Sequence, residues 1–364
     1  MNPVRPYPYL RHVWLAGLLA STILNSCSDP SPTISEPPSA PEPIIEPTPP
    51  ETTPAPAFPG QDLTWTESVP SPVALYESQG LATNGYLYIL GGYHNERIQA
   101  SASTFAFDPA PQRWSNLAPM PEKITHAGQA LYGNRIYLAG GFVGDHPGPP
   151  TDHVWVYDIF TDAWSVGPAL PEKLGGGALV ELAGRLHFFG GTVRKRFTYL
   201  RDSPRHWVLN LEAGATTWVA AADLPNPRNH IAGAALDGRV YAFGGQRLDD
   251  EVSGNQREVD VYDPASDRWQ RAADLPRPLG HISAGTFAYG GRLVVVMGVT
   301  EGRAKTSEVI AYDPAADSWA SLTRMPGGRS ATVAGVIGGN IVLSTGTVGG
   351  KPLDTTWMGS WDVN

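Results

Sequence analysis

Short apolar runs recur along the chain from residue 62 onward, separated by glycine, proline, asparagine and aspartate. The stretch Asn229–Pro276 shows the pattern most clearly. A run of small apolar residues is followed by the turn residues Asp237-Gly238, by Val240–Phe243, which is apolar throughout, and by a run ending at Tyr262. Apolar runs with turn residues between them predict antiparallel strands, and a strand that is apolar throughout is expected to be buried on both faces. With a last run around Trp269, the stretch predicts one four-stranded meander.

The same unit recurs with a period near 50 residues. A glycine doublet, or a degenerate version of it, follows the second run of each unit, at Gly91-Gly92, Gly140-Gly141, Gly190-Gly191, Gly244-Gly245, Met297-Gly298 and Thr345-Gly346. A tryptophan recurs at the same spacing, at Trp65, Trp114, Trp164, Trp218, Trp269 and Trp319. In four units an aromatic-Asp pair stands seven residues before the tryptophan. Such a sheet cannot bury both of its faces alone, so neighbouring units must stack into a ring.

Six units predict an all-β, six-bladed β-propeller. The doublet, the aromatic-Asp pair and the tryptophan resemble the kelch repeat, and the resemblance covers residue 62 to the C-terminus. The two ends of the repeat region fit a closed ring. Leu63–Trp65 matches a fourth strand with no first three before it, and Thr355–Met358 matches a third strand with no fourth after it. Pairing of the N-terminal strand with the last blade would leave no open sheet edge.

Residues 1–26 have the features of a targeting segment. A basic region with Arg5 and Arg11 precedes an apolar run, Val13–Leu24, which is too short to span a bilayer as a helix. The segment ends in Leu-Asn-Ser-Cys27, which resembles the bacterial lipobox and implies cleavage before Cys27 and lipidation of its thiol. The next residue is Ser28 rather than aspartate, which favours the outer membrane, facing the periplasm or the cell surface. An ordinary secretory signal with an incidental cysteine is the alternative.

Residues 27–60 read as the lipidated cysteine and a linker, and residues 61–364 as the propeller. Twelve of the 33 residues from 28 to 60 are proline, a composition that favours an extended stalk over a packed domain. Loss of the two arginines of the targeting segment takes the net charge from −9 to −11. This acidic balance argues against nucleic acid as a partner. Since Cys27 is the only cysteine, no disulfide can form within the chain.

The connections between the second and third strands of each unit, the b–c loops, are long, varied and polar. Loops carry function on rigid scaffolds, so the face that these loops form is the expected binding surface. The loop at residues 192–206 is basic and aromatic and includes Arg196, whereas the loop at residues 246–257 is acidic and includes Asp250. The two loops could clamp an anionic or hydroxyl-rich ligand, or they could merely balance each other's charge.

A second candidate site comes from aligning the repeats. The equivalent position at the start of the innermost strand of each unit is occupied by Glu77, His126, Gly176, His230, His281 and Ala331. These residues should ring the mouth of the central channel. Arg228 and Arg329 stand two residues before His230 and Ala331 and could point the same way.

Three interpretations of the ring remain open. Histidine is a common metal ligand, but one histidine per blade is expected to place the imidazoles far apart, so no metal and no cofactor are predicted. The histidines could instead form an acid/base pair, with arginine stabilising an anion. They could also simply hydrogen-bond water and neighbouring loops.

The sequence predicts an exported, membrane-anchored propeller that binds a glycan, a small polyhydroxylated ligand or a partner protein. The alternative is a sugar mutarotase or epimerase, because the chain is similar at the level of fold to the bacterial N-acetylneuraminate epimerase, an exported six-bladed kelch propeller. That resemblance identifies no catalytic residue. Galactose oxidase, another kelch propeller, uses a copper site with a tyrosine cross-linked to a cysteine. The position of Cys27 outside the repeats excludes that chemistry here.

Overall fold

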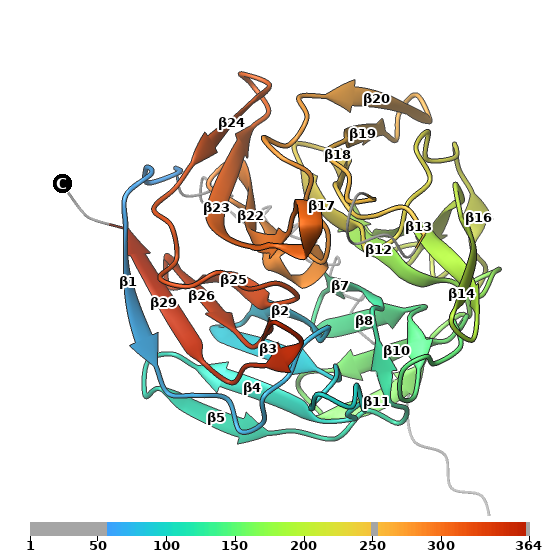
Figure 1. Cartoon of the computed structure of the whole chain (residues 1–364). Coiled ribbons are helices and arrows are strands. Elements are labelled where there is room, and N and C mark those ends of the chain that lie inside the picture. Colours follow the sequence, from blue (N-terminus) through green and yellow to red (C-terminus); the bar gives the residue numbers. More distant parts are fainter. Residues whose placement is uncertain (1–56, 249–253, 362–364) are drawn as a thin grey trace, which may run out of the picture. The chain divides into compact units, whose positions relative to one another are not determined.

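The computed structural model of the chain describes residues 57–248 and 254–361. Within them, six antiparallel sheets surround a common axis (Figure 1). The predicted all-β, six-bladed propeller is confirmed. The targeting segment, Cys27 and the linker as far as residue 56 lie outside the described residues.

The blades follow one another along the chain. The first contains β2 (Gln79–Thr83), β3 (Tyr86–Leu90), β4 (Thr104–Asp108) and β5 (Arg113–Asn116). The second contains β7 (Gly128–Tyr132), β8 (Arg135–Ala139), β10 (Val154–Asp158) and β11 (Ala163–Val166). The third contains β12 (Gly175–Leu182), β13 (Arg185–Lys195), β15 (His206–Asn210) and β16 (Val219–Ala220), with β14 (Thr198–Asp202) paired to β13.

The fourth contains β17 (Ala232–Leu236), β18 (Arg239–Phe243), β19 (Val259–Asp263) and β20 (Arg268–Ala272). The fifth contains β21 (Thr286–Tyr289), β22 (Arg292–Val299), β23 (Lys305–Asp313) and β24 (Ser318–Ser321). The sixth contains β25 (Val333–Ile337), β26 (Asn340–Ser344), β29 (Thr356–Trp361) and β1 (Leu63–Ser68).

Two short strand pairs and two 3-10 turns complete the described elements. The pairs are β6 (Ile124–Thr125) with β9 (Phe142–Val143) and β27 (Thr347–Val348) with β28 (Lys351–Pro352). The turns are η1 (Ser283–Gly285) and η2 (Glu301–Arg303). Neither helical turn in this part of the chain has the length or apolarity to cross a membrane.

The N-terminal strand closes the ring, as the unmatched ends of the repeats predict. Strand β1 pairs antiparallel with β29 from Leu63 opposite Trp361 to Ser68 opposite Thr356, and the two strands lie side by side in Figure 1. The indole Nε1 of Trp361 donates to the carbonyl of Gly60 at 3.1 Å. The last residues of the predicted linker therefore contact the propeller.

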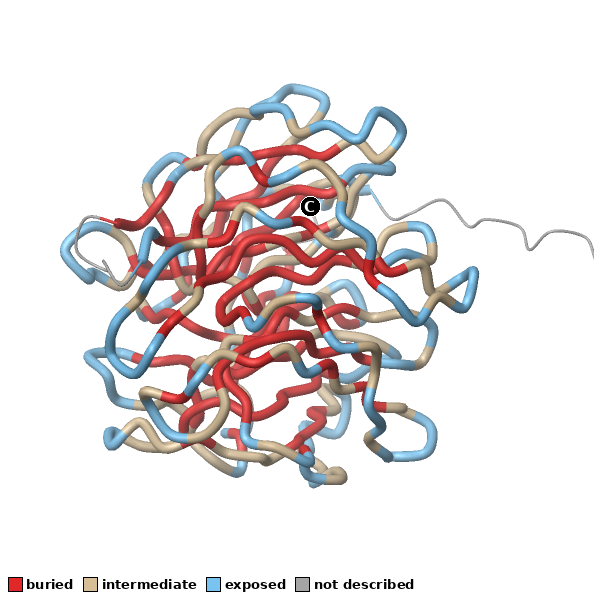
Figure 2. Tube along the Cα trace, turned by 90° about the vertical axis from the view of Figure 1, so that its right-hand side faces the viewer, coloured by how far each residue is buried: buried red, intermediate tan, exposed pale blue. Residues whose placement is uncertain are grey.

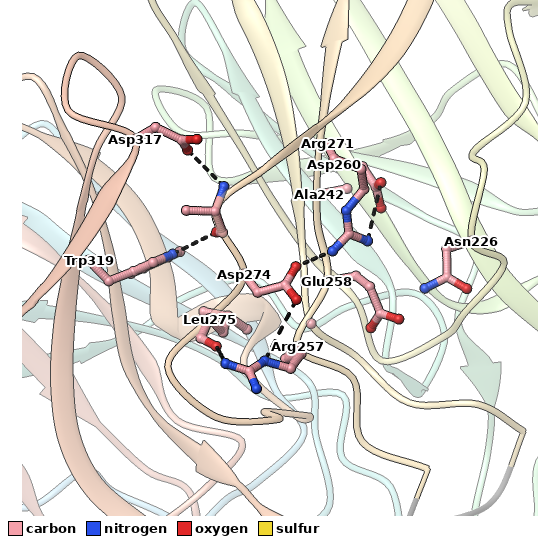
Figure 3. Close-up of polar contacts among 12 residues, drawn as sticks. Asn226, Ala242, Arg257, Glu258, Asp260, Arg271, Asp274, Leu275, Asp317 and Trp319 are labelled. Carbon is pink, nitrogen blue, oxygen red and sulfur yellow. Dashed lines mark hydrogen bonds and ion pairs between the residues drawn. The ribbon is translucent and has the colours of Figure 1, made fainter.

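The repeated glycine and tryptophan positions make the bonds between blades. The second residue of each doublet donates its N–H to a carbonyl of the next repeat, and the bond from Gly346 to Leu75 (2.8 Å) closes the ring. Each repeated tryptophan donates its Nε1–H to the preceding repeat, as Trp319 does to Ala273 at 2.9 Å (Figure 3). The backbone N–H of Ala273 in turn donates to Asp317 at 2.7 Å. Each blade is thus tied to both neighbours.

The apolar core lies between neighbouring sheets rather than within one of them. One cluster joins Phe243 and Val261 of the fourth blade to Val295 and Ile310 of the fifth. Buried residues follow the inner strands of each blade, while exposed residues concentrate in the connections (Figure 2). This rigid core holds the loops of both faces in place.

The third blade differs from the expected pattern. Its b–c connection is not simply a loop, because β13 continues to Lys195 and forms a hairpin with β14. The alternation of β-branched, aromatic and polar residues there suits a strand pair, and Arg196 has a left-handed φ of 54° at the turn. The hairpin extends this blade on the face of the b–c loops.

Candidate functional site

The six aligned positions at the start of the innermost strands share one backbone conformation. Their φ angles are 52° at Glu77, 55° at His126, 70° at Gly176, 47° at His230, 55° at His281 and 55° at Ala331. The repeat alignment is therefore correct residue by residue. Left-handed φ is uncommon for residues other than glycine, and such residues are often held in place at functional sites. All six line one small cavity in the central channel.

The three histidines converge on the axis, so the expectation that they stand far apart is wrong. The ring centroids of His126 and His230 lie 4.7 Å apart, those of His230 and His281 4.3 Å apart, and those of His126 and His281 6.4 Å apart. The channel is narrow at this level, and an imidazole from each blade reaches the centre. Gly176, between His126 and His230 in the ring, leaves room, since a Cβ there would lie 2.9 Å from the backbone nitrogen of His230.

Glu77 joins two of these histidines. Its Oε1 lies 2.5 Å from Nδ1 of His281, and its Oε2 lies 3.4 Å from Nε2 of His126. Burial works against the ionised carboxylate, but the attraction of His281 and His126 and the hydrogen bond from His281 lower the pKa of Glu77 to about 2. Glu77 is therefore a carboxylate at neutral pH.

Both ring nitrogens of His281 face acceptors. Nδ1 faces Glu77, and Nε2 lies 3.1 Å from Oε1 of Gln246. The amide of Gln246 is oriented by its own Nε2, which donates to the carbonyl of Leu248 at 3.0 Å. A doubly protonated imidazole would satisfy both contacts.

His126 and His230 are neutral. Burial is the main cause that lowers the pKa of His126 to about 4 and the pKa of His230 well below its usual value. The positive charges of His281 and Arg194 act in the same direction on both. Nδ1 of His126 lies 2.9 Å from the hydroxyl of Thr125, and Nδ1 of His230 contacts Oδ1 of Asn229. Both imidazoles are thus held through Nδ1.

The cavity between these side chains is small and polar. Its volume is about 30 Å³, enough for a water or an ion and roughly tenfold below the 300–1,000 Å³ of usual ligand pockets. Gln79 lines it, and within the described residues the buried Oε1 of Gln79 has no hydrogen-bond partner. Farther along the innermost strands the channel widens into a cavity of about 590 Å³, lined mainly by small and apolar residues. Gln129 lines both cavities.

Arg228 and Arg329 do not point toward the ring, contrary to expectation. Each guanidinium is buried in its own blade, where Arg228 donates to the carbonyl of Gly244 (2.7 Å) and Arg329 to that of Thr345 (2.9 Å). These carbonyls belong to the first residue of a doublet, so the two arginines occupy equivalent sites. Arg228 also forms an ion pair with Asp260 at 2.8 Å, and both side chains are at most 1% exposed. Their roles are structural.

Further charged side chains surround this ion pair. Nη1 of Arg271 lies 3.8 Å from Oδ1 of Asp260, and its Nη2 pairs with Asp274, which Arg257 approaches from the other side at 3.7 Å (Figure 3). The charge of Asp260 is therefore opposed by two arginines. This network belongs to the fourth blade and is separate from the ring histidines.

Of the two loop candidates, the one that the structure describes, Arg196, does not join the ring. Arg196 is exposed at the turn of the β13–β14 hairpin, and Asp250 lies outside the described residues. Sequence reasoning missed Arg194, two residues earlier on β13, which is buried and donates to the carbonyl of Gly148 at 2.5 Å. Its guanidinium lies 3.7 Å from the ring centroid of Phe142. The alternation of side chains along a strand would have predicted a buried Arg194 if β13 had been expected to continue beyond Gly190-Gly191.

Comparison with known proteins agrees with the repeat pattern. Residues 126–350 match the KLHDC2/KLHL20/DRC7 Kelch-repeats domain, and residues 79–121 match the Kelch motif. The chain is 24% identical over 270 residues to Kelch repeat-containing protein At3g27220 of Arabidopsis thaliana, which covers 70% of this chain and 62% of that protein.

Two further relatives show the same level of similarity. Kelch-like protein 35 of Mus musculus is 27% identical over 59% of this chain and 34% of its own length. Kelch-like protein terF of Aspergillus terreus is 27% identical over 61% of this chain and 49% of its own length. The chain thus spans less than two thirds of each of these relatives. With the family match over residues 126–350 and the six blades, the chain belongs to the Kelch-repeat family.

Proposed function

We propose that this kelch propeller binds a partner protein through the face formed by its b–c loops. The observation that carries the proposal is a set of three exposed apolar side chains on the third and fourth blades, Phe197, Leu200 and Leu248, called here the hairpin patch. Phe197 is 71% exposed, Leu200 56% and Leu248 43%. Exposed aromatic side chains rimmed by polar groups are typical of protein interaction sites.

Contacts between loops tie the hairpin to both neighbouring blades. Phe197 packs edge-on against His146 of the second blade, with ring centroids 6.0 Å apart. Asp202, at the end of β14, accepts a hydrogen bond from the backbone N–H of Leu248 at 2.8 Å. The patch is therefore held by three neighbouring blades. Lys195 and Arg196 at its edge favour a partner surface that carries acidic groups beside an apolar centre.

The ring geometry does not favour the alternative of a sugar mutarotase. Its substrate would have to reach the ring histidines, where the cavity of about 30 Å³ is too small for a sugar. In this conformation a glycan could contact the outer loops or enter the cavity of about 590 Å³ at the other end of the channel, but it could not reach the ring histidines. The experiment below distinguishes binding of a glycan from binding of a protein partner.

Two matched variants test the proposal. Phe197→Ser removes the aromatic centre of the hairpin patch, and Phe160→Ser removes an equally exposed phenylalanine (80%) from a tight turn on the opposite face. Proteins captured by the propeller are quantified by mass spectrometry, and a glycan array is probed in parallel. We expect Phe197→Ser to reduce capture of the partner at least about tenfold and Phe160→Ser to leave it unchanged. Equal capture by both variants, or binding to glycans alone, would contradict a protein partner on this face.

We further propose that the propeller is exported and anchored by a lipid on Cys27, with residues 28–60 as its stalk. The support is the sequence alone: the basic and apolar segment that ends in Leu-Asn-Ser-Cys27 and the proline-rich stretch after it. The predicted outer-membrane location belongs to the same proposal. Metabolic labelling with a fatty acid should mark the chain and should be lost in Cys27→Ser. Persistent labelling of Cys27→Ser would refute it.

A further inference from the structure

Three neutral or neutralisable imidazoles from three blades face one small cavity. One potential ligand atom from each of His126, His230 and His281 lies within 4.8 Å of the others. Three histidines are a known donor set for a transition-metal ion such as Zn²⁺, with metal–nitrogen distances of about 2.0–2.1 Å. We propose that His126, His230 and His281 bind one divalent transition-metal ion at the mouth of the central channel.

The hydrogen bonds of the three histidines are those of metal ligands. Metal-binding imidazoles usually donate one ring N–H to an oxygen, most often of a carboxylate, a backbone carbonyl or water, and bind the metal through the other nitrogen. Here Nδ1 of His126 contacts Thr125, Nδ1 of His230 contacts Asn229, and Nδ1 of His281 contacts Glu77. The Nε2 atoms become the donors once His281 exchanges its contact with Gln246, and His126 its 3.4 Å contact with Glu77, for the ion.

The supporting groups are themselves fixed. Nδ2 of Asn229 donates to Asp202 at 2.6 Å and to the carbonyl of Leu248 at 3.0 Å, so its Oδ1 must face His230. Glu77 supplies a carboxylate that holds His281 and offsets the charge of the ion.

The cavity suits an ion in size and access. A volume of about 30 Å³ accommodates an ion with little more than a water. The buried and unpartnered Oε1 of Gln79, within the described residues, offers an acceptor to a hydrated ion. The wider cavity shares Gln129 with this one, so movement of the Gln129 side chain would open an entry path for the ion. Tetrahedral geometry requires nitrogen separations of roughly 3.3 Å, so the side chains must close by about 1–1.5 Å.

The test uses the untagged full chain, stripped of metal with EDTA and titrated with ZnCl₂ by calorimetry. We expect one equivalent of Zn²⁺ to bind and to survive gel filtration. His230→Gln and His281→Gln should weaken the affinity at least about 100-fold. His153→Gln replaces a histidine that is 48% exposed and should bind as the unmodified chain does. Absence of binding by the unmodified chain, or equal affinity in the ring variants, would show that the cluster is only a hydrogen-bonded plug.

A second measurement does not depend on the folding of variants. X-ray absorption of the zinc-loaded unmodified chain reports the type and number of ligands. The proposal requires three imidazoles and no sulfur. Fewer than three imidazoles, or a sulfur ligand from Cys27, would overturn it, whether or not the variants fold.

Discussion

Burial sets the charge of the histidines in and around the channel. The pKa is lowered to about 4 at His126, to about 3 at His187 and to about 4 at His206, and burial is the largest cause at each. His187 and His206 form a second pair, in the third blade, with ring nitrogens 3.0 Å apart. All three histidines are neutral at pH 7 in the folded chain. An unfolded histidine titrates near pH 6.5, so folding and proton uptake are linked.

Stability should therefore fall with pH in a defined range. Below about pH 6.5 the unfolded chain takes up protons that the folded chain cannot, so stability is complete above pH 6.5 and is lost toward pH 4. Within this range, each of these histidines lowers the free energy of unfolding by about 1.4 kcal/mol for every pH unit of acidification. Glu77, with its pKa lowered to about 2, contributes stability above about pH 4.5 that is lost only at lower pH.

Urea unfolding of the full chain at pH 7.5, 6.5 and 5.5, with EDTA present, measures this slope. An unfolding free energy that stays constant from pH 7 to pH 5 would contradict the neutral, buried state of these imidazoles.

A further prediction concerns Arg228, whose role depends on its burial. Arg228→Met removes one partner of the buried ion pair and leaves Asp260 without its nearest cation. Such a change should cost about 3–5 kcal/mol of unfolding free energy. Arg196→Met, at the exposed hairpin turn, should change it by less than about 0.5 kcal/mol. Similar urea midpoints for the two variants would indicate that Arg228 is not structural.

Strand pairing by β1 determines whether the sixth blade and the ring are complete. It supplies the edge strand next to β29, and Trp65 on it donates to the carbonyl of Thr323 in the fifth repeat at 3.1 Å. Leu63 is buried in the apolar cluster between the fifth and sixth blades. Without this strand, β29 would have an open edge and that cluster would be exposed.

Deletion of residues 62–70 should therefore destabilise the whole propeller. We expect the melting temperature to fall by on the order of 10 °C, since several kcal/mol of pairing and burial are lost. Deletion of residues 36–44, of the same length but outside the described residues, is the control and should not change it. If both deletions melt like the unmodified chain, closure by β1 does not stabilise the ring.

Short-range patterns predicted the elements well, and for physical reasons. Strand period, turn residues such as Asn84-Gly85 (φ 50° and 82°) and the doublets depend only on local backbone preferences. The repeat then located the ring positions. The convergence of His126 and His281 depends on the width of the channel, which no local pattern encodes. The orientation of Arg228, whose guanidinium turns into its own blade, likewise depends on Asp260, a partner some 30 residues away in sequence.

The two ends of the propeller differ in what they can recognise. At the b–c loop end, four side chains from four blades nearly close the channel, leaving about 30 Å³. At the end with the tight a–b turns, the channel widens to about 590 Å³. An ion or a water fits the closed end, whereas a larger partner must bind on its outer surface. The hairpin patch lies on this face, where we propose that a partner protein binds.

Site-specific photocrosslinking from the two faces tests that placement most directly. A photoreactive phenylalanine analogue is introduced at position 197 or at position 160, both strongly exposed phenylalanines on opposite faces. Crosslinked products from cells are then identified by mass spectrometry. The account predicts a discrete protein adduct from position 197 and none from position 160. Adducts from position 160 alone, or none from position 197, would contradict it.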